Sequence, residues 1–491
     1  MDIAINRRTF VGGAVAAGVA AATVKAAPLA QADENVVDAD IAIVGGGMSG
    51  LVCALQAAQE GARVVMLEKN ATCGGNGLVV ECAFARDSSL QREKGIEFPL
   101  SKVLVDEQVM TRYLGDSTAW RQLDKNSGAN IDWLLEQGVT FSDVDDYHGF
   151  SHVACAHEFE GGGAQAMATL EQAARDNGVE ILTETPVKEL VIADDGTVCG
   201  VVAEDASGSA VRVNAKAVVL ATGGFQGNPQ MMAERGYPAD NCWDEGLPGH
   251  DGDGLRMAIE AGGMDVSMKR SHVSAQAFRD FSVPGLFGLA HRGDYLWVNQ
   301  DGERFANEDC TMECPVFPAN AVFSQPRCYS LFDSAFLDRH EKRAEFVEAF
   351  GEGAENERFV ADTIEELAEK AGIDPAALRA TVDHYNECCA DGFDDEYEKD
   401  PEILQPIEEG PFYLIHKIVR FMATIGGIRT NKNMQVVDHN NVPVEGLYAI
   451  GVDGCELYVT AYTLGLAGSS DANNTNSGRI AAQHAVATYV K

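Results

Sequence analysis

A loop of three glycines between an apolar strand and a helix is the feature that most constrains how this chain folds. Residues Asp38–Val44 form a short apolar run that predicts a buried strand, and Leu51–Gly61 has the apolar spacing of an amphipathic helix. Gly45, Gly47 and Gly50 stand between them as a G-x-G-x-x-G pattern. The first glycine makes the turn, the second lets a pyrophosphate approach the backbone, and the third lets helix and strand pack closely. Since the helix start also offers N–H groups to an anion, the segment predicts a dinucleotide site.

A carboxylate ends the next predicted strand, Arg63–Glu68. Glu68 lies 18 residues beyond Gly50, close to the spacing of about 20 residues at which a carboxylate hydrogen-bonds a ribose hydroxyl. A negative charge at this place repels a 2′-phosphate, which argues against NADP. The βαβ unit therefore predicts NAD or FAD.

The charge of the chain excludes one class of partner. Its 75 acidic and 37 basic residues give a formal net charge of −38. No basic surface is therefore expected for the phosphates of DNA or RNA. A solvated acidic surface is the expected use of this charge, and docking of a basic electron-transfer protein is the alternative.

Twelve cysteines are scattered through the chain without a C-x-x-C pair or a C-x-x-C-H haem attachment. We expect them to be buried free thiols, and we expect no metal site. Any haem that takes part must then belong to another chain.

The first 32 residues resemble a twin-arginine export signal. Arg7 and Arg8 precede a weakly apolar run from Val11 to Val24, and a small-residue stretch ends at Ala32, where we expect cleavage. The run of about 14 residues is shorter than the ~20 that a bilayer span needs, so no permanent membrane span is expected. The signal predicts export to the periplasm or the outer face of the cytoplasmic membrane. Since no NAD(P)H pool exists there, a separate cytochrome or quinol-linked protein would donate the electrons.

Strands and helices follow one another up to residue 263, and the composition then changes. Residues 264–410 are interpreted as an inserted second domain, and strands return from residue 411. The expected strands are 179–182, 187–193, 198–203, 211–213, 217–220, 435–437 and 447–450, and the expected helices are Leu255–Ala261, Ala335–Phe350, Ile364–Lys370 and Ser477–Tyr489.

Five further motifs carry a resemblance to a known family. They are Cys73-Gly74-Gly75-Asn76-Gly77, Ala221-Thr222-Gly223-Gly224-Phe225, Gly252-Asp253-Gly254, the run Val298–Glu308 and the run Gly446–Gly451. Together they resemble the fumarate reductase and succinate dehydrogenase flavoproteins over nearly all of Asp38–Lys491. The resemblance implies an α/β fold with FAD as the cofactor. Its Rossmann-like FAD-binding domain would comprise residues 37–263 and 411–491, with an inserted α+β capping domain of residues 264–410.

The resemblance also implies which residues contact FAD. Small residues near the C-terminus would present N–H groups to the flavin pyrimidine edge and stabilise the negative charge of the reduced flavin. Ser469 and Ser470 are the expected donors, with a helix N-cap as the alternative. The full expected set is Gly45, Gly47, Ser49, Gly50, Glu68, Lys69, Gly74, Gly75, Asn76, Gly77, Val187, Ala221, Thr222, Gly223, Gly224, Asp253, Gly451, Ser469 and Ser470.

Three positions depart from the family at the substrate end. Met312 stands where the soluble fumarate reductases have their proton-donating arginine, Ala423 where they have a histidine, and Gly465 near their second substrate-binding arginine. Two carboxylates buried without such cations would cost several kcal/mol. Fumarate and succinate are therefore not expected as substrates.

The expected catalytic residues are Tyr462, Arg292 and Glu313. Tyr462 lies where the related 3-ketosteroid dehydrogenases have a tyrosine near the flavin, and a phenol can donate a proton. Arg292 matches a family arginine on the substrate side, with a plain salt bridge as the alternative. Weaker candidates are Tyr458, His291 and His272.

The resemblance implies an anaerobic reductase. Reduced FAD would pass a hydride from N5 to an activated C=C bond of a small organic acceptor that is bulkier and less anionic than fumarate, such as an enoate, a phenolic or flavonoid, or a steroid. One alternative is a dehydrogenase of the 3-ketosteroid type that works in the oxidative direction. The other is a non-catalytic flavin electron carrier, although a carrier has no need to enclose a substrate.

Overall fold

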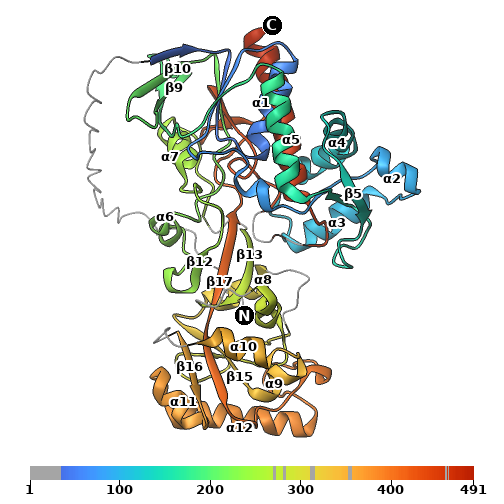
Figure 1. The fold of residues 1–491 in the computed structure, drawn as a ribbon, viewed down its shortest axis with the longest axis vertical. Coiled ribbons are helices and arrows are strands. Elements are labelled where there is room, and N and C mark those ends of the chain that lie inside the picture. The colour runs from blue at the N-terminus through green and yellow to red at the C-terminus, as the bar shows by residue number, and fades with distance from the viewer. Residues whose placement is uncertain are drawn as a thin grey trace, which may run out of the picture.

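The computed structural model describes residues 35–268, 272–279, 284–309, 316–351, 357–458, 462 and 464–491. The twin-arginine segment, Met312 and Glu313 lie outside these residues. Figure 1 shows two bodies along the long axis, connected by the long strand β17 (Phe412–Thr424). Within the described ranges, no helix combines the length and the apolarity that crossing a bilayer requires.

The upper body is built on a six-stranded sheet. In spatial order its strands are β18 (Gln435–Val437), β19 (Pro443–Ala449), β11 (Ala217–Leu220), β2 (Ile41–Val44), β3 (Val64–Leu67) and β7 (Glu180–Leu182). All neighbours are parallel except β18, which pairs antiparallel with β19. The strands β2, β3 and β11 are apolar tetrapeptides buried at every residue, as strands covered on both faces are. The predicted α/β fold is confirmed.

Three helices cover one face of this sheet and lie together in Figure 1: α1 (Met48–Gln59), α5 (Gly162–Asp176) and α13 (Ser469–Ala485). Ile43 of β2 shares one core with Leu51, Leu170 and Ala481 of these helices. Ala42 points to the opposite face. There it packs with helix α7 (Asp253–Glu260) and with a second sheet, β1 (Asn35–Asp38), β10 (Ala210–Asn214), β9 (Val198–Glu204) and β8 (Val187–Ile192).

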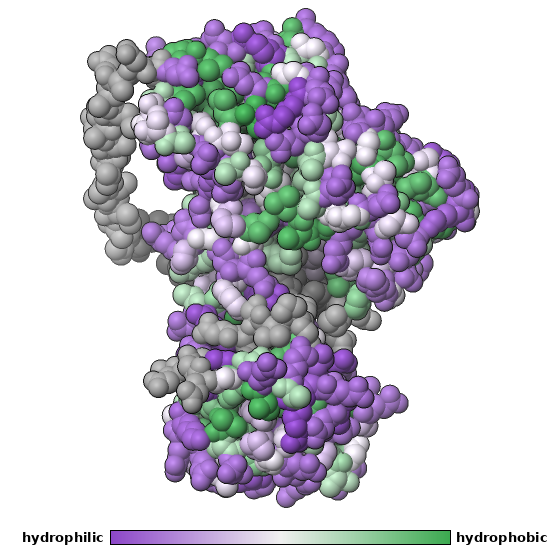
Figure 2. Space-filling view, viewed as in Figure 1, coloured by the Kyte–Doolittle hydropathy of each residue, from purple (hydrophilic) through white to green (hydrophobic). Residues whose placement is uncertain are grey.

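A helical lobe extends from the upper body. It contains α2 (Ser89–Lys94), α3 (Leu100–Met110), α4 (Ser117–Glu136) and a small sheet in the order β4 (Cys82–Phe84), β6 (Ala156–Phe159) and β5 (Phe141–Asp145). Figure 2 shows mainly hydrophilic residues over the face in view, in keeping with the net charge of −38.

The lower body is a sheet with helices packed against it. β17 pairs with β12 (Cys242–Asp244), β13 (His272–Phe278), β15 (Cys328–Asp333) and β16 (Arg358–Ala361), and β15 also pairs with β14 (Leu296–Asn299). Leu296, Leu331 and Leu414 of the sheet form one core with Leu378 and Tyr385. The helices are α8 (Val316–Phe323), α9 (Ser334–Arg339), α10 (Arg343–Phe350), α11 (Ile364–Ala371) and α12 (Pro375–Asp391).

The sheet of the lower body extends beyond the predicted insertion on both sides. Strand β12 precedes residue 264 and strand β17 follows residue 410, yet both pair within this sheet. The boundaries at 263/264 and 410/411 therefore do not coincide with the ends of the sheet, because its central strand comes from the C-terminal segment.

Two expected helices differ from the observed ones. The helix expected over Ala335–Phe350 is divided into α9 and α10, because Glu341 adopts a left-handed conformation with φ +56°. The last helix begins at Ser469 instead of Ser477, after Gly468, whose φ is +76°. The 17-residue helix α12 was not predicted.

Candidate functional site

A cavity of about 460 Å³ opens at the carboxyl ends of the parallel strands. Val44 ends β2, Leu67 ends β3 and Ala221 follows β11, and all three line the cavity. Open α/β sheets bind their ligands at this edge. The volume lies in the range of roughly 300–1,000 Å³ usual for small-molecule and cofactor sites. The sheet thus positions a cavity where the sequence predicts a dinucleotide.

The three loop glycines differ in what surrounds them. A Cβ on Gly45, whose φ is +105°, would lie 2.2 Å from the carbonyl oxygen of Ala221, and one on Gly50 would lie 2.1 Å from the carbonyl oxygen of Gly45. A Cβ on Gly47 would meet only the carbonyl oxygen of Gly74, at 3.9 Å, and Gly47 lines the cavity. Gly45 and Gly50 therefore permit the turn and the packing of α1, whereas Gly47 leaves the space that a pyrophosphate would fill.

Glu68 is held beside this loop by backbone donors. Its Oε2 accepts a hydrogen bond from the N–H of Gly46 at 2.7 Å, and its Oε1 accepts one from the N–H of Asn70 at 2.8 Å. The residue directly follows β3 and lines the cavity. Its carboxylate stands where a ribose carboxylate is expected.

The Gly74–Gly77 segment connects the glycine loop to the lower body. The N–H of Gly74 donates to the carbonyl of Gly46 at 2.8 Å. The side-chain amide of Asn76 donates to the carbonyl of Met422 in β17 and accepts from the N–H of Leu247 at 3.0 Å. One wall of the cavity is therefore tied to the central strand of the lower sheet.

The buried carboxyl of Asp453, which was not predicted from the sequence, links the motifs at Ala221–Phe225, Gly252–Gly254 and Gly446–Gly451. Asp453 accepts hydrogen bonds from the N–H of Thr222 at 2.6 Å and from its hydroxyl at 3.1 Å, and that hydroxyl accepts one from the N–H of Gly254 at 3.0 Å. Burial raises the pKa of Asp453 to about 7, against the lowering effect of the bonds from Thr222. Its position two residues after Gly451 is the only local signal for it.

Lys69 faces the cavity as one member of an ion triplet. Its Nζ lies 2.8 Å from a carboxylate oxygen of Asp251 and 2.8 Å from one of Asp253. Burial alone lowers the pKa of Lys69, but the bonds to the two carboxylates outweigh it and raise the pKa. Lys69 is thus already neutralised within the protein.

Four of the expected FAD contacts lie behind the cavity wall. A Cβ on Gly224 would lie 2.3 Å from the hydroxyl of Thr424, and one on Gly451 would lie 2.5 Å from the hydroxyl of Ser49. Ser469 is buried and accepts a hydrogen bond from the hydroxyl of Tyr458. Gly50 packs against the loop, as described above. The remaining expected contacts, Val187 and Asp253 among them, all line the cavity.

The start of α13 forms one side of the cavity. Ser470 and Asp471 lie in the first turn of this helix and line the cavity, where N–H groups have no acceptor within the helix. Burial raises the pKa of the Asp471 carboxyl to about 7, against the lowering effect of the bond from Asn474. Asp471 was not predicted as a site residue, and the only local signal for it is its position directly after Ser469 and Ser470.

The structure separates the expected catalytic residues. Tyr462 lines the cavity and is 8% exposed. Burial, followed by the charge of Asp471, raises its pKa well above the ordinary value of 10. Arg292 does not line this cavity. It lies at a second hollow of about 360 Å³, with Asp294 and Glu402. Glu313 lies outside the described residues.

The described part of the cavity wall contains no arginine. Ala423, Leu464 and Tyr462 all line it, and Ala423 is the residue that stands where the fumarate reductases have a histidine. His250 is the histidine among these lining residues, and burial lowers its pKa. The wall thus offers no free cation to a dicarboxylate among the residues that the structure describes.

Comparison with known proteins supports a flavin dinucleotide as the ligand of this cavity. Residues 40–468 match the FAD binding domain family. The vinyl phenol reductase of Lactiplantibacillus plantarum is 31% identical over 478 residues, which cover 91% of this chain and 96% of that protein. The cytochrome-type fumarate reductase of Shewanella frigidimarina is 29% identical over 434 residues, which cover 87% of this chain and 73% of that protein.

The fold is also that of a solved steroid enzyme. The structure of 3-ketosteroid-Δ4-(5α)-dehydrogenase from Rhodococcus jostii superposes with a TM-score of 0.67 at 23% identity, covering 93% of this chain and 98% of that chain. Together with the glycine loop, the carboxylate after β3 and the cavity at the strand ends, these comparisons settle the cofactor as FAD. The chain belongs to the FAD binding domain family and is an FAD-dependent oxidoreductase of the fumarate reductase-like group that acts on CH–CH bonds.

Proposed function

We propose that this protein reduces the activated C=C bond of a neutral or phenolic acceptor, in the manner that the name of its vinyl phenol reductase relative suggests. The observation that carries the proposal is the cavity wall around Ala423, Leu464 and Tyr462. It combines apolar side chains with a phenol and, among the described residues, has no arginine. A dicarboxylate would lose its hydration there without gaining a free cation from the residues that the structure describes, whereas an aromatic alkene would gain apolar contact.

Tyr462 is the proposed proton donor. When bound, reduced FAD supplies the hydride, and the chain must supply a proton to the neighbouring carbon. Burial, followed by the charge of Asp471, raises the pKa of Tyr462, so the phenol keeps its proton at neutral pH and is available as an acid. Once Asp471 is protonated its charge no longer opposes formation of tyrosinate, so a neutral Asp471 makes Tyr462 the stronger acid.

Turnover is expected to fall as the pH rises through about 7, the pKa to which burial raises Asp471. Below this pH the carboxyl is neutral. Above it the carboxylate hinders loss of the Tyr462 proton. The measurement is kcat against pH for the wild type and for Asp471→Asn, whose amide is neutral throughout and should abolish the inflection. An inflection that persists in Asp471→Asn would exclude this carboxyl.

The oxidative direction is the second candidate. Its support is the fold shared with the 3-ketosteroid dehydrogenase, and the same apolar wall would suit a steroid. A flavin electron carrier is the third hypothesis. The cavity disfavours it, because electron transfer alone needs no enclosed space for a substrate.

Export by the twin-arginine route, with a cytochrome or quinol-linked donor outside the cytoplasm, is part of the proposal. It is supported by Arg7, Arg8 and the weakly apolar run that follows them.

One experiment separates these functions. The FAD-loaded protein is reduced anaerobically with dithionite, freed of excess reductant and mixed with a vinyl phenol, a cinnamate-type enoate, a flavonoid, a 3-ketosteroid or fumarate. We expect a phenolic or enoate acceptor to reoxidise the flavin and to be recovered with its C=C bond reduced, and fumarate to be inert. Rapid reoxidation by fumarate would overturn the proposal, and reoxidation by a cytochrome alone would favour the carrier. The oxidative alternative predicts that a saturated 3-ketosteroid reduces the oxidised flavin.

A further inference from the structure

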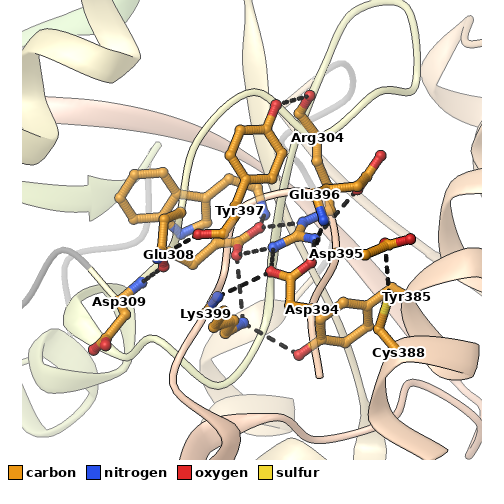
Figure 3. Close-up of polar contacts among 12 residues, drawn as sticks. Arg304, Glu308, Asp309, Tyr385, Cys388, Asp394, Asp395, Glu396, Tyr397 and Lys399 are labelled. Carbon is orange, nitrogen blue, oxygen red and sulfur yellow. Dashed lines mark hydrogen bonds and ion pairs between the residues drawn. The ribbon is translucent and has the colours of Figure 1, made fainter. Parts of the chain in front are cut away.

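Three metal-ligating side chains meet in the lower body, outside the FAD cavity. His384 and Cys388 lie four residues apart on α12, so they share one face of the helix. The helix ends at Gly392, whose φ is +69°, and the chain then turns back. This turn brings Asp395 against both side chains, as Figure 3 shows for Asp395 and Cys388.

The ligand atoms are spaced nearly as around a tetrahedral ion. His384 Nε2 lies 2.8 Å from Asp395 Oδ1, and Cys388 Sγ lies 3.4 Å from Asp395 Oδ1 and 3.9 Å from His384 Nε2. Zinc bonds of about 2.3 Å to sulfur and about 2.0–2.2 Å to nitrogen and oxygen place ligand atoms about 3.4–3.6 Å apart. Each observed separation differs from these values by about 0.6 Å or less. Small rotations of the side chains are therefore enough to enclose an ion.

The loop that carries Asp395 is held in place by the residue before it. Asp394 accepts two hydrogen bonds from Arg304, each of 2.9 Å, and further bonds of 3.2 Å from the N–H groups of Glu396 and Lys399. Figure 3 shows this buried network next to Cys388 and Asp395. Because these bonds fix the position of the loop, little conformational entropy opposes ion binding.

The surroundings favour a particular class of ion. A thiolate and an imidazole are the ligands that zinc-like ions prefer, whereas magnesium and calcium prefer oxygen. Cys388 is buried, whereas the side chains of His384 and Asp395 are 41% and 58% exposed, so an ion can enter from solvent and keep a water. The Nδ1 of His384 lies 3.9 Å from a carboxylate oxygen of the exposed Glu387, which is beyond hydrogen-bond distance.

We propose that His384, Cys388 and Asp395 bind one divalent transition ion of the zinc class, with water as the fourth ligand. His384 binds through Nε2 and keeps its proton on Nδ1. The thiol of Cys388 loses its proton to solvent as the sulfur–metal bond forms. None of the three residues lines the FAD cavity. The ion therefore links α12 to the loop after it and takes no part in the redox chemistry.

The test uses the full-length, FAD-loaded protein, treated with EDTA and desalted. Zn²⁺ is titrated by calorimetry, and Co²⁺ by absorbance. We expect one ion per chain from this site, a thiolate-to-cobalt charge-transfer band and a higher unfolding temperature with Zn²⁺. His384→Ala and Asp395→Asn change exposed side chains and should weaken Zn²⁺ binding at this site by more than about 100-fold.

Cys389→Ser is the matched control. Cys389 is the next residue on α12, and its thiol is directed at Tyr385 instead of His384. This variant should retain the ion and the cobalt band, whereas Cys388→Ser should lose both. Zn²⁺ affinity that is the same in the wild type, His384→Ala and Asp395→Asn would overturn the proposal, as would a cobalt complex without a thiolate band. Should Cys388→Ser fail to fold, the band in the wild type and the two exposed variants still decide the question.

Discussion

Replacement of Tyr462 by phenylalanine is expected to lower kcat for the acceptor by about 10²–10⁴-fold, the usual contribution of a positioned general acid. The change removes one hydroxyl and retains the ring, which packs edge to face on Tyr458 with centroids 5.0 Å apart. FAD occupancy and the KM for the acceptor should change little, because the phenol acts when the proton is transferred. The rate of flavin reoxidation, measured over a range of acceptor concentrations, gives the turnover rate and the KM. Flavin absorbance gives the FAD occupancy.

Tyr458→Phe is the control for Tyr462. Tyr458 belongs to the same buried cluster, but its hydroxyl donates to Ser469 and the residue does not line the cavity. The variant should therefore retain most of the activity. Equal losses in the two variants would indicate a packing role for both tyrosines, and unchanged turnover in Tyr462→Phe would exclude this residue as the donor.

Replacement of Arg304 by methionine is expected to lower the free energy of unfolding by about 3–5 kcal/mol, the usual effect of breaking a buried ion pair. The guanidinium is 1% exposed and contacts Glu308 and Asp394, whose side chains are fully buried, at 2.8 and 2.9 Å. It also lies 4.9 Å from the ring centroid of Tyr397 (Figure 3). Without Arg304, Glu308 keeps the ammonium of Lys399 at 3.4 Å, whereas Asp394 keeps only backbone N–H donors such as that of Lys399 among the described contacts. Urea unfolding of the FAD-loaded protein measures the loss.

Two further variants test whether the loss of stability in Arg304→Met comes from the broken buried ion pair. Arg175→Met breaks an exposed pair with Glu171 and should cost about 0–1 kcal/mol. Arg304→Met combined with Asp394→Leu should recover part of the stability, because one unpaired buried carboxylate is removed. Should Arg304→Met prove no more destabilising than Arg175→Met, the network would not be what holds the loop of Asp395 in place.

The same network shows what one sequence motif does in the fold. Arg304 and Glu308 belong to the run Val298–Glu308 that carries the family resemblance, and both are buried in the lower body and do not line the cavity. Burial by itself raises the pKa of Asp394, but the bonds from Arg304 outweigh it and lower the pKa to about 2. The stabilisation from Asp394 is therefore fully present above the ordinary Asp pKa of about 3.9 and is lost as the pH falls through about 2.

Some of the missed structure was present in the sequence as local signals. Helix α12 has Asp374 as its N-cap, Pro375 at its first position and Gly392 after its end, which are ordinary helix boundaries. Strand β17 begins directly after residue 411, where strands were expected to return, but its length and its partners had no local signal. His416 and Lys417 interrupt its apolar run. They can be buried because His416 hydrogen-bonds the carboxylate of Glu357 and Lys417 donates to the carbonyl of Ala290. Those partners are distant in the sequence, so the apolar pattern alone could not place this strand.

The sequence by itself determined the FAD end of the molecule, because the chemistry there is local. Strand, glycine loop, helix, strand and Glu68 lie within a single short segment, and the spacing of glycines and carboxylate follows directly from the geometry of that unit. Only the tertiary structure decided the rest. It brought Asp453 to Thr222, Asp471 to Tyr462 and Asp395 to Cys388, and it placed Arg292 away from the cavity. Whether such a group is buried, and therefore whether it is charged, depends on long-range packing.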